Sequence, residues 1–418
     1  MNYLVIKATT FVFVNQGKVL LYDSITNNKQ FYDNSDIAKV FKNRYHGLNV
    51  FAIDIITDEI KDLANKIKES GMGWLACDTK VAPFQPCLMP ALNFDDKGNI
   101  KDKLAPVTKN LNKAVDDVLK IMVFVDANLS NEKDLYSINY QTIFACNNTV
   151  SRALDALKIK KFIPSLNTFA NLFEIAIVCN NTCNGPVAID LLKHFYSLVR
   201  KRTKVVLYID GVESLKDSNI EYTINLTNSF HQLHIVLCVY EYQMNFELIQ
   251  KIKYFSSRSI NNVALKIAIQ KQTGSSIYKE HLNELQHIIY APVYNGGNKD
   301  FFCNNVFLSK DEIYQLKPTA NDVLMNQVLN ANYFGNIIID SEGMVYSRPN
   351  GKMMGVIQPD QDIVDFIENN AISDDWFLTR NKVSPCSNCL FQYICPPISN
   401  YEFIFNRYNL CGYASENL

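Results

Sequence analysis

The chain begins with short runs of β-forming residues, followed by two segments of helical periodicity. Turn-forming residues separate the β-forming runs, as in hairpins, and the runs cover Tyr3–Val14, Lys18–Asp23 and Gln30–Tyr32. Apolar residues recur at helical spacing over Ile37–Tyr45 and Asp58–Ser70, and Gly71 ends the second helix. Three short strands with helices predict a winged-helix-like domain over residues 1–76.

Residues 77–118 carry no comparable pattern. This segment contains several residues that break regular structure, namely Pro83, Pro86, Pro90, Gly98 and Pro106. We expect a linker that runs over a surface rather than a folded unit.

From residue 121 onward, apolar runs alternate with helical segments such as Val187–Arg200. The apolar runs are Ile121–Asp126, Phe173–Val178, Lys204–Ile209, His234–Tyr240, Val263–Ile269 and His287–Tyr290. This alternation predicts an α/β fold with a parallel sheet and right-handed crossovers. Six strands over residues 119–300 indicate a partial (β/α)6 barrel, because a closed eight-stranded barrel would need more chain.

The alternation ends after residue 300. Phe334–Ile339 and Met344–Ser347 form a predicted hairpin across Ser341-Glu342-Gly343, and a helix is expected near Gln361–Asn369. Residues 301–418 therefore form a separate, cysteine-rich C-terminal region.

Composition narrows the class of protein. The chain has 418 residues, 48% of them hydrophobic and 20% charged, which is enough to build a large core. Lys and Arg number 41 against 42 Asp and Glu, so no nucleic-acid footprint is expected. No apolar run is long enough to span a membrane, and Met1–Lys7 lacks the features of a signal peptide, so we expect a cytoplasmic protein without a membrane partner.

Four of the 11 cysteines have the spacing of metal ligands. Cys386, Cys389 and Cys395 read C-x2-C-x5-C, and Cys411 follows. Thiolates at this spacing can bind one zinc ion or one iron–sulfur cluster, and in either case the expected role is to clamp the C-terminal segment. The other cysteines are scattered through apolar segments, as small hydrophobic residues are in a reducing compartment: Cys77, Cys87, Cys146, Cys179, Cys183, Cys238 and Cys303.

Several C-terminal segments resemble a known family. They are Phe391–Glu402, Asn409-Leu410-Cys411, Asn295-Gly296-Gly297-Asn298, Phe301-Phe302, Asn305-Val306-Phe307 and Phe334-Gly335. Together with the layout, they resemble radical SAM enzymes with a C-terminal SPASM domain, and especially the pseudo-radical-SAM proteins of Bacteroidales peptide-modification clusters. The resemblance rests on motifs from Asn295 onward and on layout alone before that.

The resemblance implies one auxiliary cluster instead of the usual two. The outer cluster of a SPASM domain is bound by a pattern that maps onto Cys386, Cys389, Cys395 and Cys411, which favours one 4Fe–4S cluster over zinc. The inner cluster needs cysteines at positions where this chain has Ser399 and, in the upstream hairpin, Ser347-Arg348.

The resemblance also implies that the catalytic cluster is missing. Radical SAM enzymes carry C-x3-C-x2-C in the loop after strand one, and here the loop Ala127–Tyr140 contains no cysteine. The turn after strand two, Cys179–Cys183, lacks the glycines that would bind S-adenosylmethionine. If strand one were instead Phe173–Val178, the third ligand position would be Pro186. In either register we expect no functional S-adenosylmethionine site and no catalytic residues.

Many peptide maturases begin with a winged-helix domain that takes up a leader peptide by strand addition, and the resemblance implies that Gln30, Phe31 and Tyr32 would do so here. A generic dimerisation or docking domain is the alternative. The expected function is that of an inactive radical SAM homologue in ribosomal peptide maturation, binding a precursor peptide, an active radical SAM/SPASM maturase in a hetero-oligomer, or both.

Two alternatives remain at this stage: a peptide-modifying enzyme with an atypical site, and a zinc-clamped scaffold. Asn295-Gly296-Gly297-Asn298 is expected to be a turn rather than a phosphate loop, since no helix clearly follows it.

Overall fold

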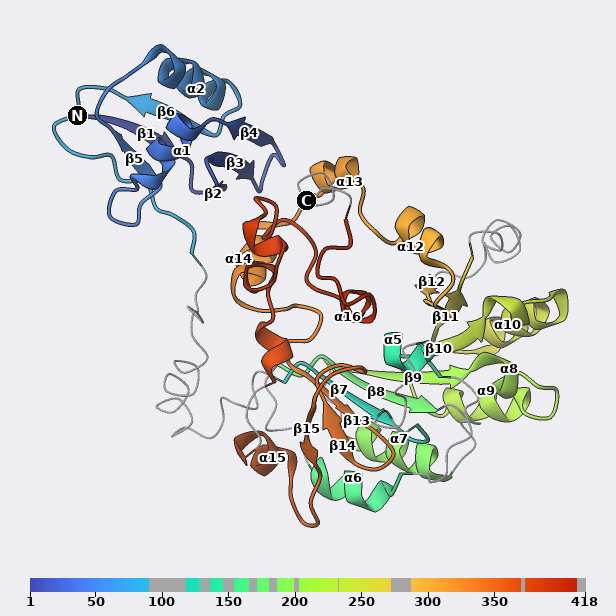
Figure 1. Cartoon of the computed structure of the whole chain (residues 1–418). Coiled ribbons are helices and arrows are strands. Elements are labelled where there is room, and N and C mark those ends of the chain that lie inside the picture. Colours follow the sequence, from blue (N-terminus) through green and yellow to red (C-terminus); the bar gives the residue numbers. More distant parts are fainter. Residues whose placement is uncertain are drawn as a thin grey trace.

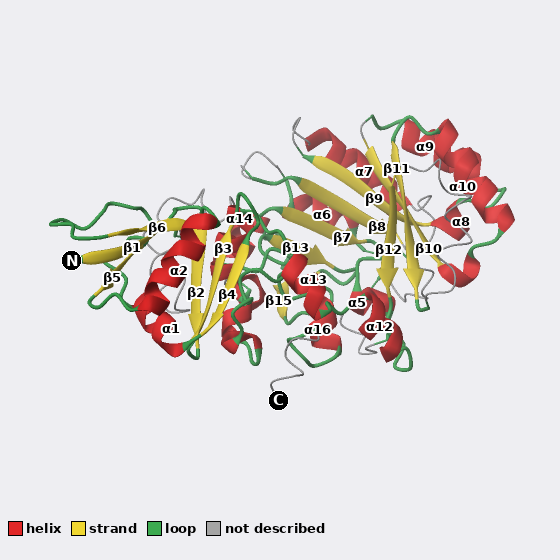
Figure 2. Ribbon diagram, turned by 90° about the horizontal axis from the view of Figure 1, so that it is seen from above, coloured by secondary structure: helices red, strands yellow, loops and turns green. Residues whose placement is uncertain are grey.

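The structure is a computed structural model that describes residues 1–89, 118–127, 129, 136–145, 154–164, 171–179, 186–198, 203–231, 233–271, 287–369 and 373–411. The N-terminal part lies at one end of the molecule and a large sheet at the other, with the C-terminal segment between them (Figures 1 and 2). Most of the predicted linker and the positions of Cys146 and Cys183 lie outside the described residues.

The N-terminal part contains two antiparallel sheets. One has the order β5-β1-β6 and the other β2-β3-β4. The strands are β1 (Asn2–Ile6), β2 (Thr10–Asn15), β3 (Lys18–Asp23), β4 (Lys29–Asp33), β5 (Val50–Ile53) and β6 (Gly73–Ala76). The predicted strand Tyr3–Val14 is therefore wrong as one element, because the chain turns at Lys7 and Thr10 N donates to Lys7 O at 3.0 Å. The strands β5 and β6 were not predicted.

Local signals explain the helices and the tight hairpin of this part. The side chain of Asn34 caps α1 (Ser35–Lys42), and that of Thr57 caps α2 (Asp58–Glu69). Gln16 and Gly17 connect β2 to β3 with φ values of 46° and 79°, the conformation that two-residue hairpins favour. The apolar faces of both helices pack on β1 and β3 to form the core.

The predicted parallel sheet is present. Six strands lie side by side in chain order, each parallel to the next: β7 (Lys120–Phe124), β8 (Glu174–Cys179), β9 (Lys204–Asp210), β10 (Leu233–Tyr240), β11 (Asn262–Ile269) and β12 (His287–Pro292). The predicted hairpin is also present, as β13 (Asn336–Ile339) and β14 (Met344–Tyr346), and β15 (Met353–Val356) extends it. Because β13 pairs with β7, the strands β7 to β15 form one open nine-stranded sheet, with β12 at one edge and β15 at the other.

Helices cover one face of this sheet. Alternate strand residues such as Ile121 and Val123 pack against α6 (Ala156–Phe162), α7 (Pro186–Leu198), α9 (Ile220–Asn228), α10 (Phe246–Arg258) and α15 (Ile363–Asn369). Other helices are α5 (Ile138–Gln141), α8 (Gly211–Ser214), α12 (Lys299–Asn305), α13 (Lys310–Gln315), α14 (Ala320–Val328) and α16 (Asn400–Ile404). The opposite face is also covered, which accounts for the almost continuous apolar runs of the strands.

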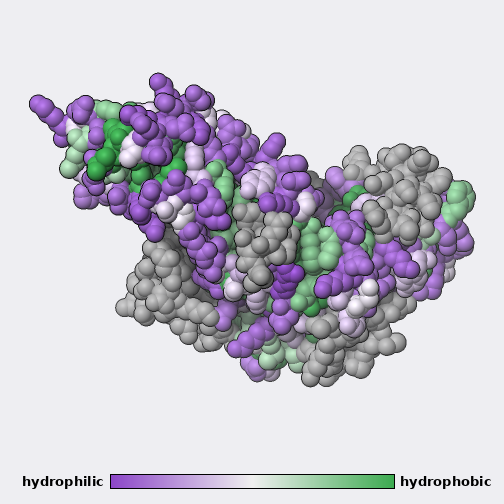
Figure 3. All heavy atoms as spheres, turned by 45° about the horizontal axis from the view of Figure 1, so that its top comes forward, coloured by the Kyte–Doolittle hydropathy of each residue, from purple (hydrophilic) through white to green (hydrophobic). Residues whose placement is uncertain are grey.

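The sheet β2-β3-β4 packs on the C-terminal segment. Four buried side chains of β2 and β3 share one cluster with residues of α13, α14 and the cysteine-rich segment: Phe11, Phe13, Leu20 and Tyr22. The rings of Phe13 and Tyr393 lie 5.6 Å apart, and Tyr22 Oη donates to Pro318 O at 2.6 Å. The C-terminal segment thus obtains much of its core from the N-terminal part. Outside these contacts the surface in view is mainly hydrophilic, with hydrophobic patches on the N-terminal part (Figure 3).

Candidate metal centre

The four predicted ligand cysteines line one cavity. Cys386 begins a short 3-10 helix, Cys386–Asn388, and Cys389 directly follows it. Cys395 ends a turn in which its N–H donates to Phe391 O at 2.9 Å. Cys411 is brought back by Leu308, whose N–H donates to Leu410 O at 3.0 Å. The other lining residues are Leu308, Ile313, Arg380, Pro385, Gln392, Asn409 and Leu410.

The four thiols lie around one cavity. Within the part of the chain that the structure describes, no group of three or more His, Cys, Asp or Glu side chains is arranged to hold a single metal ion. The donor chemistry nevertheless fits a metal centre, because four thiols in a largely apolar shell are the ligand set of a structural zinc ion or an iron–sulfur cluster.

Burial keeps the thiols of Cys386, Cys389 and Cys395 protonated in the absence of metal. Burial raises the pKa of Cys386 and Cys395, and it raises the pKa of Cys389 to about 11. Charge on the neighbouring thiols raises these pKa values further, whereas the Arg380 guanidinium lowers them. Since thiolates are the metal-binding form, loading this site must release protons.

Arg380 was not predicted from the sequence, although it contacts the cavity. Its Nη1 lies 3.6 Å from Cys386 Sγ and donates to Tyr408 O at 3.0 Å. Its Nη2 pairs with Glu402 Oε1 at 2.7 Å, and both side chains are buried. Glu402 also accepts from Ser399 N at 2.7 Å, in the capping box of α16. The S-x-x-E pattern of that capping box is the one sequence signal that could have drawn attention to this pair.

A polar network lies at the positions where the resemblance would place the cysteines of an inner cluster. Ser347 Oγ donates to Asp375 Oδ2 at 2.8 Å, and Arg348 Nε forms an ion pair with the same carboxylate at 3.1 Å. The Arg348 guanidinium also lies 3.5 Å from the centre of the Phe403 ring, one turn after Ser399. A buried cation and its carboxylate therefore fill the space beside α16.

The segment that follows β7, which includes α5, covers the face of the sheet opposite α6, α7, α9, α10 and α15. Phe144 and Ala145 are fully buried against Val178, Val236 and Cys238 in the centre of that face. Of the predicted cofactor loop Ala127–Tyr140, residues 128 and 130–135 lie outside the described residues, as does the turn after Cys179.

A buried lysine holds this segment in place. Lys266 Nζ, from β11, donates to Thr142 Oγ1 at 3.0 Å and to Ile143 O. Burial lowers the pKa of Lys266 to about 8, with smaller effects from Cys238 and Lys120. Only 9% of this residue is exposed, so its ammonium group is bonded almost entirely within the protein.

The predicted peptide-binding residues lie on β4, an outer strand of the sheet β2-β3-β4. Tyr32 Oη donates to Gln30 Oε1, and Gln30 Nε2 donates to Lys66 O at 3.1 Å, so α2 borders this strand. The ring of Phe31 is 36% exposed. None of the three residues lines the cysteine cavity, so the two predicted sites are separate.

The predicted turn at Asn295 is confirmed. Asn295 Oδ1 accepts from the N–H groups of Gly297 and Asn298, both at 3.0 Å, and Gly296 has a φ of 85°. The expectation that no helix follows is wrong, because α12 begins at Lys299.

No helix among the described residues combines the length and apolar character needed to cross a bilayer.

Comparison with known proteins does not identify the chain. No protein-family model matches the sequence, and the search of curated proteins gives no significant match.

Proposed function

We propose that this protein is a catalytically silent radical SAM homologue that acts as a binding partner in ribosomal peptide maturation. In this proposal the parallel sheet is a partial (β/α)6 barrel, flanked by a winged-helix-like domain and a SPASM-like cysteine domain. Its role is to hold a precursor peptide, an active maturase, or both, in the cytoplasm.

The observation that carries the proposal is the position of the segment after β7. In open parallel sheets, ligands bind beyond the carboxyl ends of the strands, and the first such loop would carry the catalytic cluster. Here that loop has no cysteine in its sequence; Ile138 near its end and the following Phe144 and Ala145 pack on the face of the sheet. In this proposal, these side chains take the place that a cofactor and substrate would have in an active homologue.

The cysteine cavity supports a structural centre. Four thiols around one cavity can bind a 4Fe–4S cluster or a zinc ion, and the resemblance of their spacing to that of the outer SPASM cluster favours the 4Fe–4S cluster. When bound, such a centre would cross-link Cys411 to the loop that carries the other three cysteines. Because Cys389, Cys395 and Cys411 pack against the cluster that includes Phe11 and Phe13, this cross-link would stiffen the support of the N-terminal part.

Peptide uptake is assigned to the outer edge of β4. In the register of β3 and β4, Phe31 faces Leu20, whereas the neighbouring pairs Leu21–Gln30 and Val19–Tyr32 make the ladder hydrogen bonds. The N–H and C=O of Phe31 therefore point away from the sheet, where an added strand would bind them. The exposed ring of Phe31 offers an apolar contact beside these groups.

A backbone-specific variant tests this assignment. Phe31→Pro removes the outward N–H without removing a ladder bond, and Phe31→Ala keeps it. For the precursor peptide encoded beside this protein, we expect the proline variant to lower the affinity about tenfold or more relative to the alanine variant. Equal affinities of the two variants would reject strand addition at β4.

The partner role has its own test. The purified protein is used to capture the precursor peptide and the neighbouring maturase, with and without reconstituted metal. Binding of at least one of them is expected. Failure of the protein to bind either would overturn the proposed function as a whole.

A further inference from the structure

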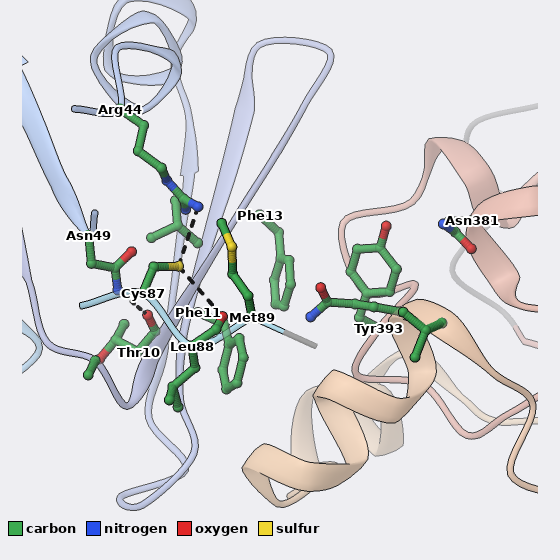
Figure 4. A pocket seen from close by; sticks show the side chains of 14 residues that line it. Thr10, Phe11, Phe13, Arg44, Asn49, Cys87, Leu88, Met89, Asn381 and Tyr393 are labelled. Carbon is green, nitrogen blue, oxygen red and sulfur yellow. Dashed lines mark hydrogen bonds between the residues drawn. The ribbon is translucent and has the colours of Figure 1, made fainter. Parts of the chain in front are cut away.

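A groove of about 380 Å³ follows the outer edge of β2, on the side of the sheet remote from β4. Figure 4 shows Phe11 and Phe13 facing Tyr393 across it, with Arg44 and Asn49 on the N-terminal side. The groove thus lies between the N-terminal part and the C-terminal segment.

The backbone of β2 offers unused hydrogen-bonding groups to this groove. Asn15 and Lys18 close the β2–β3 hairpin, so alternate residues, Val12 and Val14, have their N–H and C=O groups on the outer side. Thr10, the third outward residue, is already satisfied, since its N–H donates to Lys7 O and its C=O accepts from Asn49 Nδ2 at 3.1 Å. Within the described residues no hydrogen bond reaches the outward groups of Val12 or Val14.

The wall of the groove contains a buried amide, that of Asn49, which uses only one of its two polar atoms in the hydrogen bonds of the described residues. Asn49 is 1% exposed, and its Nδ2 donates to Lys7 O and Thr10 O, which determines the orientation of the amide. Among the described residues, no donor reaches its buried Oδ1. Leaving a buried acceptor unpaired is unfavourable, so this atom points to a ligand that donates an N–H.

Charge and shape narrow the class of that ligand. Among the described residues that line the groove there is no Asp or Glu, and Arg44 is the one cation. Arg44 Nη1 contacts Cys87 Sγ at 3.4 Å, and among the described residues no carboxylate pairs with Arg44. The aromatic wall of Phe11, Phe13 and Tyr393 suits apolar side chains. An extended backbone with an acidic residue near Arg44 matches all three features.

We propose that this groove binds an acidic peptide segment in extended conformation, as a strand added to β2. The peptide backbone pairs with the outward groups of Val12, one peptide N–H donates to Asn49 Oδ1, and an acidic side chain faces Arg44. This inference deepens the proposed function, because the ligand is a segment of the same precursor peptide, but it uses a strand edge distinct from that of Phe31.

The test measures binding of the fluorescently labelled precursor peptide by anisotropy. Val12→Pro removes the outward N–H and leaves the ladder intact, and Val12→Ala is its matched control. Gln327→Trp fills the groove from α14 without changing β2, in case the proline variant does not fold. We expect Val12→Pro and Gln327→Trp to weaken binding about tenfold or more, and Val12→Ala to have little effect.

The outcomes separate this inference from the proposed function. If Gln327→Trp and a folded Val12→Pro bind the peptide as wild type does, the groove is not a peptide site, even where Phe31→Pro abolishes binding. If they weaken binding and Phe31→Pro does not, the β2 groove stands and the β4 assignment falls. An Arg44→Gln variant should weaken binding of the wild-type peptide, and it should not affect a peptide whose acidic residues are replaced by amides; equal effects on both would contradict the acidic contact.

Discussion

Arg380 connects the cysteine cavity to the helix that follows it. Its guanidinium touches Cys386 Sγ, pairs with Glu402, and donates to two backbone carbonyls, those of Pro396 and Tyr408. A lysine could not make this set of contacts, because one ammonium group lacks the planar fork. The sequence pattern of the cysteines alone did not reveal this residue, since no periodicity or spacing links it to them.

Truncation of Arg380 should destabilise the metal-free protein. Arg380→Met leaves the Glu402 carboxylate buried without its cation, which costs about 3–5 kcal/mol. Adding Glu402→Gln should recover part of this loss, so the double variant should be less destabilised than the sum of the single variants. Denaturant unfolding of the three variants measures this, and additivity within about 0.5 kcal/mol would contradict the coupling.

Lys266 should make stability depend on pH. Its folded-state pKa of about 8 lies below its unfolded value of about 10.4, so the unfolded chain binds more protons between these values. The free energy of unfolding of the wild type, relative to Lys266→Met, should therefore rise as the pH increases from about 8 to about 10. The nearby Cys238 does not titrate in this window, because burial raises its pKa to about 12. A pH-independent difference would rule out the buried lysine as the cause.

At the scale of elements, the sequence predicts the long strands of the parallel sheet better than it predicts the short strands. Six strands of the sheet have apolar runs long enough to be recognised, and all six are present. The strands β5, β6 and β15 have only four residues each, which is too short for a periodicity, whereas the similarly short β13 and β14 are recognised by the turn Ser341-Glu342-Gly343 between them. Tyr3–Val14 is divided into two strands at the turn that Asn49 holds. The side chain of Asn49 donates to Lys7 O and Thr10 O from a distant position in the sequence, which no local pattern reveals.

The segment after β7 should behave as part of the core. Phe144 is fully buried and lies 5.4 Å from the Tyr240 ring. Phe144→Ala should cost about 3–5 kcal/mol through the cavity it creates, and Phe144→Leu less than about 1.5 kcal/mol. Thermal or denaturant unfolding measures both. Near-equal stability of wild type and Phe144→Ala would show that this segment is not part of the core on that face of the sheet.

At the scale of the molecule, the N-terminal sheet and the cysteine segment depend on each other. The cluster that joins them is built from residues nearly four hundred positions apart, such as Phe13 and Tyr393, and no local pattern in the sequence could predict that contact. It places the candidate metal centre directly behind the β2–β3 hairpin. The fold could be predicted element by element, but the groove beside β2 could not, because it exists only where these parts meet.

Metal loading should therefore tighten the N-terminal sheet. Hydrogen exchange of β2 and β3 should slow when metal is bound, because the segment that supports them is then cross-linked. Exchange in β8 to β10 serves as the control and should not change, because these strands are not part of the cluster that joins β2 and β3 to the cysteine segment. Equal exchange of β2 and β3 with and without metal would contradict this coupling.

The central claim is that the chain holds one structural cluster and no catalytic one. Anaerobic reconstitution with iron and sulfide, followed by quantification of both per chain, tests it most directly. The account predicts about four irons and four sulfides, lost in a Cys386→Ser/Cys389→Ser variant. About eight irons would reveal a second, catalytic centre, and one zinc without sulfide would indicate a zinc-clamped scaffold; either result would contradict the account.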